Sequence, residues 1–261
     1  MLDKEKFGIV KPGDSKHGRT ILIYGEAGRG KTTLLNTIKR STLLINIDCG
    51  EQVLEKNGEV DVFNLVRDSA DTAKKRIERF EGFCTWLLEY KEPLPWGVVT
   101  IDNITVLQNN YTESLGIQRQ VKYPRQLEYR DTGIEMERWL TNLRNLNYRG
   151  VHVVYLAWED TNKIEDKGGE ITSAIVPMIM GKTCTKIRGL VDFVMVMRVG
   201  KKGERYLQLD GDALYMAKKR EEPGIEYPSY IECPKGEVDT LEKFFKLMEG
   251  GMAINEKCDK N

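Results

Sequence analysis

The stretch that decides the fold reads Gly25-Glu26-Ala27-Gly28-Arg29-Gly30-Lys31-Thr32, and it fits the pattern G-x-x-x-x-G-K-[ST] in full. In such a loop, backbone N–H groups point at the oxygens of a phosphate chain and the lysine neutralises them. The pattern requires a buried strand before the loop and a helix after it. Residues 20–24 are apolar and β-branched, and Leu34, Leu35 and Ile38 keep helical spacing. The sequence therefore predicts a phosphate-binding loop between a strand and a helix.

The loop also predicts the ligand. Residues from Gly25 to Thr33 are expected to hold ATP, with Lys31 on its terminal phosphates. Thr32 offers its hydroxyl to Mg²⁺, which makes it a candidate metal ligand. The alternative is a glycine-rich turn without a ligand.

A second acid is expected near the metal ion, at the end of a neighbouring strand. Residues 96–102 form a short apolar run that ends in Asp102, so Asp102 is the predicted metal-side acid. An aspartate at this place can instead cap the following helix. The next residue is Asn103 rather than glutamate, so a catalytic base must come from elsewhere. We expect it just beyond the second strand, with Glu51 as the first candidate and Asp48 as the alternate, unless both are solvated loop acids.

Composition limits the possible classes of protein. With 261 residues and 40% hydrophobic content, the chain can form one large domain. Its 40 basic and 40 acidic residues cancel, which argues against a protein that coats a polyanion. The five cysteines are scattered and include no C-x-x-C, so we expect reduced thiols and no zinc site. Without an apolar signal region or a run long enough to span a membrane, the sequence predicts a soluble, cytoplasmic protein.

The order of predicted elements gives the fold class. Strands at 43–47, 96–102 and 151–157 alternate with helices at 69–91 and 133–147, which is typical of a mostly parallel sheet with helices on both faces. Strand-like segments at 191–199, 205–209 and 213–217 are joined by glycine-containing turns and predict an antiparallel C-terminal extension. A last helix is expected at 241–248. We divide the chain into an arm (1–18), one α/β domain (19–249) and a disordered tail (250–261).

This pattern resembles the RecA-like P-loop ATPases, and more narrowly the phage-encoded P-loop nucleotide-binding proteins that include the Sak-type single-strand annealing ATPases. The likeness covers roughly residues 7–235 and rests on the order of segments 21–33, 98–105, 151–159, 177–182, 191–194 and 217–220. It implies a RecA-like core that hydrolyses ATP and acts on single-stranded DNA in recombination or annealing, in the cytoplasm of a phage's host. It also implies self-association as a ring or filament, with a single-strand-binding protein as a further partner.

The resemblance implies roles for three more residues. Glu159 would lie at the sensor position that couples the γ-phosphate to the following loop. Lys218 and Arg220, spaced as K-x-R, would reach a nucleotide bound by the neighbouring subunit, although such a pair can also be a solvated basic turn. The predicted catalytic set is Lys31, Glu51, Asp102, Glu159, Lys218 and Arg220.

Two basic segments, 119–130 and 160–188, are predicted to bind single-stranded DNA, because cations follow phosphates and aromatic rings stack on bases. The candidates are Arg119, Lys122, Tyr123, Arg125, Arg130, Lys182, Lys186 and Arg188. Charge runs are also typical of solvated faces. Two other classes stay open: a small-molecule kinase, in which segment 119–130 closes as a lid, and a nucleotide-binding scaffold with little turnover.

Overall fold

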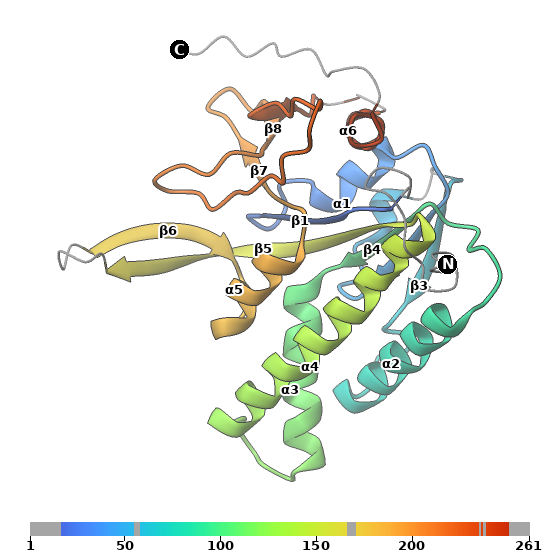
Figure 1. The fold of residues 1–261 in the computed structure, drawn as a ribbon. Helices are drawn as coiled ribbons and strands as arrows, with labels where there is room; N and C mark the ends of the chain where they lie inside the picture. Colours follow the sequence, from blue (N-terminus) through green and yellow to red (C-terminus); the bar gives the residue numbers. More distant parts are fainter. Residues whose placement is uncertain (1–16, 55–57, 166–170, 235, 237–238, 251–261) are drawn as a thin grey trace, which may run out of the picture.

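The strand that leads into the phosphate-binding loop lies inside a sheet of nine strands in the computed structural model, which describes residues 17–54, 58–165, 171–234, 236 and 239–250. The strand order is β3-β2-β4-β5-β1-β7-β8-β9, and β6 pairs with β5 (Figure 1). The strands are β1 (Thr20–Gly25), β2 (Thr42–Asn46), β3 (Val60–Asn64), β4 (Val98–Asp102), β5 (His152–Glu165), β6 (Ile171–Pro177), β7 (Phe193–Val199), β8 (Arg205–Gln208) and β9 (Tyr230–Glu232). The α-helices are α1 (Lys31–Leu34), α2 (Ala73–Glu89), α3 (Ile104–Gln118), α4 (Gln126–Arg144), α5 (Gly181–Leu190) and α6 (Thr240–Met248).

The centre of the sheet is parallel. Strand β1 pairs in parallel with β5 and β7, and the pairs β4–β5, β2–β4 and β2–β3 are parallel as well. The pairs β7–β8, β8–β9 and β5–β6 are antiparallel. The predicted α/β P-loop core with a mostly parallel sheet, extended by antiparallel strands toward the C-terminus, is confirmed.

Alternation along each strand directs side chains to two separate cores, because successive residues of a strand point to opposite faces. Leu22 and Tyr24 belong to the core beneath α2, α3, α4 and α5, whereas Ile21 and Ile23 belong to the core beneath α1 and α6. Helices thus cover both faces of the sheet, as the sequence predicts.

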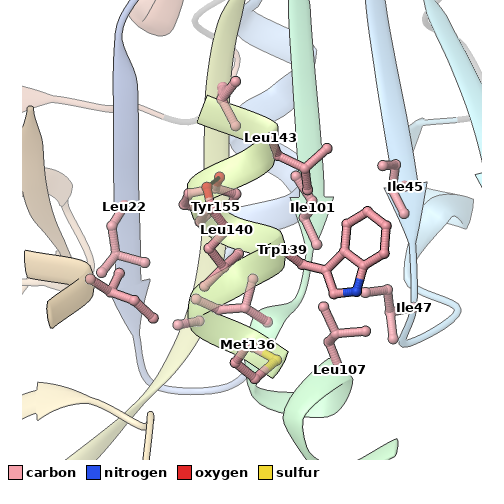
Figure 2. Packing of buried hydrophobic residues seen from close by; sticks show 14 of the residues in the cluster. Leu22, Ile45, Ile47, Ile101, Leu107, Met136, Trp139, Leu140, Leu143 and Tyr155 are labelled. Atoms are coloured by element: carbon pink, nitrogen blue, oxygen red, sulfur yellow. Dashed lines mark hydrogen bonds between the residues drawn. The ribbon is translucent and has the colours of Figure 1, made fainter. Parts of the chain in front are cut away.

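Helix α4 shows how the larger core is built. Met136, Trp139, Leu140 and Leu143 recur at helical spacing and point at the side chains of the central strands, among them Tyr155 of β5 (Figure 2). The sequence predicted this face, but it placed the start of the helix at residue 133 rather than Gln126. The earlier turn is stabilised because the carboxylate of Glu128 accepts the backbone N–H of Arg125 at 2.7 Å.

Other elements differ from the prediction. The helix after the loop is short, since α1 gives way to a 3-10 turn at Leu35–Thr37. Segment 160–188 consists mostly of regular elements: β5 runs on to Glu165 and pairs with β6, and α5 follows. Its Gly168-Gly169 pair lies outside the described residues, as do residues 1–16 and 251–261 of the expected arm and tail. No helix in the described ranges is long and apolar enough to cross a bilayer.

The expected strand at 213–217 is absent from the sheet, and β9 takes its place. The carboxylate of Asp212 accepts the backbone N–H groups of Leu214 (2.8 Å) and Tyr215 (2.6 Å). A side chain that captures these donors removes them from a strand ladder. Only isolated bridges, such as that between Tyr215 and Ile175, remain.

Candidate nucleotide-binding site

The loop after β1 has the backbone that a phosphate cradle needs. Gly28 and Gly30 have φ angles of 76° and 97°, which favour glycine over any other residue. The Nζ of Lys31 donates to the carbonyl oxygens of Gly25 (2.8 Å) and Glu26 (2.9 Å). Burial lowers the pKa of Lys31, and nearby carboxylates oppose this effect. The loop therefore holds a buried cation among its own backbone groups.

Asp102 ends β4 beside the loop, where the sequence placed it. The hydroxyl of Thr32 donates to its Oδ2 at 2.5 Å. Asp102 is buried, with 2% of its surface exposed. This burial raises the pKa of Asp102 to about 7, and the charge of the neighbouring Asp48 raises it further. The two predicted metal-side groups, Thr32 and Asp102, are therefore in direct contact.

Asp48 comes shortly after β2, the strand that pairs with β4, and lies near Asp102 and Thr32. Its Oδ2 accepts a hydrogen bond from the side-chain amide of Asn103 at 2.7 Å. Its Oδ1 is buried without a well-formed hydrogen bond in the part of the chain that the structure describes. A Cβ at Gly50 would lie 3.2 Å from this Oδ1 and 3.6 Å from the hydroxyl of Thr32, so both atoms border the same small space. Burial raises the pKa of Asp48.

Glu51, the first candidate for the base, is held elsewhere. Its Oε2 accepts a hydrogen bond from the side-chain amide of Asn46 at 2.6 Å. The carboxylates that act most strongly on the Lys31 cation are instead those of Asp102, Glu159, Asp48 and Glu26. The geometry therefore favours Asp48, the alternate, over Glu51. The sequence missed the part played by Asn103, which orients Asp48.

Glu159 does lie at the loop. It follows Trp158, the residue of β5 that pairs with Gly25 at the end of β1. Its carboxylate accepts the backbone N–H of Glu26, and burial raises its pKa. Its place next to the phosphate-binding loop agrees with the sensor position, while the coupling role stays a prediction.

The donor set fits a magnesium ion that arrives with a nucleotide. No cluster of three or more His, Cys, Asp or Glu side chains occurs within the described ranges. Mg²⁺ usually takes one or two carboxylates and completes its octahedral shell with substrate phosphates and water. The hydroxyl of Thr32 and the carboxylate of Asp102 are oxygen donors of this kind.

The raised pKa of Asp102 predicts how stability depends on pH. Because its pKa is about 7 in the folded chain against an ordinary 3.8, the folded state holds this proton more tightly than the unfolded state. The stabilising contribution is fully present below pH 3.8 and is lost as pH rises to 7. We expect the nucleotide-free protein in a chelating buffer to lose free energy of unfolding across this window, and Asp102→Asn to flatten the curve. Denaturant unfolding at several pH values measures this, and parallel curves for the two proteins would contradict it.

The K-x-R pair lies at the opposite end of the sheet from its own loop. The guanidinium of Arg220 pairs with Asp192 at 2.8 Å, and Asp192 accepts the backbone N–H of Thr20, the first residue of β1. The Nζ of Lys218 donates to the carbonyl oxygens of Arg188 and Val191. Both cations therefore lie far from the phosphate-binding loop of their own chain. Their contact with the nucleotide of a neighbouring subunit stays a prediction. Arg220 suits it better than Lys218, because Arg220 is half-exposed.

The first set of predicted DNA-binding residues lies around the junction of α3 and α4: Arg119, Lys122, Tyr123, Arg125 and Arg130. A surface hollow of about 710 Å³ there is lined by Arg119, Val121, Arg125, Gln126, Leu127, Glu128 and Arg130. Tyr123 (70%) and Tyr129 (49%) are exposed, and the ammonium of Lys122 lies 5.3 Å from the ring centre of Tyr123.

Acidic residues neutralise part of this charge. Arg119 pairs with Glu128 and Asp131, which holds its guanidinium in place. The second set lies on α5, which packs against α4, and there Lys186 pairs with Glu137 at 2.5 Å. The two sets therefore share one side of the molecule, but they are less basic than the sequence implies.

A family model described as "AAA domain" matches residues 17–221. No curated protein matches the sequence. Among solved structures, the crystal structure of the flagellar accessory protein FlaH from Methanocaldococcus jannaschii is similar, with a TM-score of 0.43 and 11% identity over 89% of this chain and 92% of that chain. Because the family model spans well over half of the sequence, the chain belongs to the AAA domain family of P-loop proteins.

Proposed function

We propose that the protein binds ATP with Mg²⁺, hydrolyses it and couples this reaction to single-stranded DNA. One observation carries the nucleotide part: Lys31, Thr32, Asp102 and Asp48 come from three separate segments and meet at one edge of the sheet. A P-loop lysine with an acid-bound threonine hydroxyl beside it is the arrangement that a triphosphate and its metal require.

The residues divide the reaction among them. Lys31 leaves its loop carbonyls to neutralise the terminal phosphates. Thr32 and Asp102 would hold the metal ion, which would supply positive charge against the charge that develops on the transferred phosphoryl group. Asp48, kept in place by Asn103, orients a water molecule with its Oδ1 and accepts a proton from it. The water oxygen forms a bond to the γ-phosphorus while the bond to the bridging oxygen breaks, which releases ADP and phosphate.

The test of this proposal is ATP turnover by the full chain, with and without single-stranded DNA. We expect phosphate release that requires Mg²⁺ and increases when DNA is present. ATP binding without measurable turnover in either condition would favour a nucleotide-binding scaffold. Turnover that requires a small phosphate acceptor would favour a kinase.

The DNA part rests on the hollow between α3 and α4, which Arg119, Arg125 and Arg130 line, and on the exposed Lys122, Tyr123 and Tyr129 of the same segment. Neutralising each phosphate of a single strand releases a counterion and adds about 0.7 to the salt slope of binding. We expect Lys122, Arg125 and Arg130, replaced together by alanine, to lower the slope by about 2 and to weaken binding at low salt.

The matched control removes three exposed lysines elsewhere on the molecule, Lys75, Lys91 and Lys246. Fluorescence anisotropy of a labelled oligonucleotide, at several salt concentrations, measures both variants. If the control and the hollow variant lose the same affinity and slope, the hollow is not the binding surface.

Self-association is the second part of the proposal. Arg220 lies at the end of β1 that is remote from its own loop, so only the loop of another subunit is open to it. A ring or filament would bring the two ends together, and a single-strand-binding protein is a further proposed partner on the DNA.

A further inference from the structure

The hairpin of β7 and β8 borders the phosphate-binding loop. Strand β7 pairs with β1, and the last pair of this ladder is Val196 with Tyr24. Beyond this pair, β7 continues beside the start of the loop. The approach is close, because a Cβ at Gly25 would lie 2.7 Å from the carbonyl oxygen of Met197. After the turn, the first residue of β8 is Arg205, which pairs with Val199. Strand β8 therefore begins near the loop, with an arginine as its first residue, and runs away from it.

Packing fixes the direction in which this arginine points. Arg205 and Leu207 share one face of β8, since alternate residues of a strand do so. Leu207 is fully buried in the core that also contains Leu34 and Leu35, directly behind the loop. The Nη1 atom of Arg205 lies 2.8 Å from the position that a Cβ at Gly30 would take. The guanidinium thus rests against the backbone of the loop, in space that only a glycine leaves open.

The charge of Arg205 is not neutralised within the part of the chain that the structure describes: its guanidinium makes no ion pair or hydrogen bond there. The nearby arginines differ, because Arg29 pairs with Glu26 and Arg198 donates to Gln208. A guanidinium presents five N–H donors in a planar fork that matches phosphate oxygens. Its neighbour Gly30 belongs to the backbone that cradles a phosphate chain.

We propose that Arg205 donates hydrogen bonds to the phosphate oxygens of the nucleotide bound by the loop of its own chain. The inference rests on the proposed nucleotide binding and adds a second cation to it, one that the sequence did not reveal. No motif marks Arg205, because its partner Gly30 is distant in the sequence and only the hairpin brings the two together. Unlike Arg220, Arg205 would act within one subunit.

Isothermal titration of the full chain with Mg²⁺ and ATP or ADP tests the inference. Arg205→Ala is expected to weaken ATP binding about 10- to 100-fold, because it removes charge-assisted hydrogen bonds. Arg205→Lys, which keeps the charge and loses the fork, is expected to lie between alanine and the parent. Lys202→Ala, which removes an exposed charge from the same hairpin, is the matched control and should change affinity less than about twofold. The melting temperature of the nucleotide-free Arg205→Ala protein should equal that of the parent.

The outcomes separate this inference from the proposed function. If the parent binds ATP and Arg205→Ala binds it equally well, the inference alone is overturned. Equal losses in Arg205→Ala and Lys202→Ala would overturn it too, because they would reflect overall charge. A destabilised alanine variant, together with parental affinity in Arg205→Lys, would assign Arg205 a purely structural role. If the parent itself binds neither nucleotide, both the proposed function and the inference fail.

Discussion

Replacement of Lys31 by alanine is expected to abolish ATP binding, with an affinity loss of more than about 100-fold, and to leave the fold intact. Lys31 is the buried cation of the loop, and without ligand its Nζ donates to the carbonyl oxygens of Gly25 and Glu26. In the complex, these two hydrogen bonds are exchanged for contacts with charged phosphate oxygens, which are roughly twice as strong as neutral ones. The largest part of the binding energy at the terminal phosphates therefore depends on this side chain.

The nucleotide-free variant should unfold at nearly the same temperature as the parent. Burial lowers the pKa of Lys31, which means that the folded chain disfavours its charge. Removing the cation relieves this penalty and offsets the loss of two hydrogen bonds, so we expect a net change within about 1 kcal/mol. Calorimetric titration and thermal unfolding measure the two quantities.

Arg29→Ala is the matched control, since Arg29 is an exposed cation of the same loop and already pairs with Glu26. Its ATP affinity should fall only a few-fold. Parental ATP affinity in the Lys31→Ala protein would show that the loop does not bind a triphosphate.

Local sequence was enough for the parts of the site that depend on short-range rules. The loop is a contiguous pattern, and Asp102 was found because an apolar run of strand length ends in it. The apolar strands also predicted a sheet that is buried on both faces, and alternate residues of β1 do belong to two different cores. These predictions needed no knowledge of how the segments lie in space.

The predictions that failed depend on contacts between distant segments. Helix α3 was not predicted, because Gln108, Asn110, Thr112 and Ser114 are buried and hide its apolar period. The contact between Glu51 and Asn46 was not foreseen either; it follows a turn in which Cys49 has a φ of 60°, and which carboxylate acts as the base stays a prediction. The sequence does not reveal such a turn, because left-handed angles are uncommon outside glycine.

Asp48→Asn is expected to reduce ATP turnover at least about 100-fold while ATP affinity changes little, because a positioned base contributes this factor or more. The substitution keeps the size of the side chain and removes its ability to accept a proton. The matched control is Glu51→Gln, an equally conservative change in the acid that Asn46 holds aside, and its turnover should stay within a few-fold of the parent. Phosphate release at saturating ATP and Mg²⁺ gives turnover, and titration gives affinity.

A second measurement separates a base from a metal ligand. If Asp48 chiefly held the metal ion, Asp48→Asn would weaken Mg²⁺-dependent ATP binding as Asp102→Asn should, and turnover would recover at high Mg²⁺. A base gives a loss of turnover that no Mg²⁺ concentration restores. The variant should also lower the pKa of Asp102, because the charge of Asp48 is one of the causes that raise it. The pH window in which the nucleotide-free protein loses stability would then end at lower pH. If Glu51→Gln loses turnover and Asp48→Asn keeps it, the order that the sequence suggested is right, and the turn at Cys49 must rearrange when the nucleotide binds.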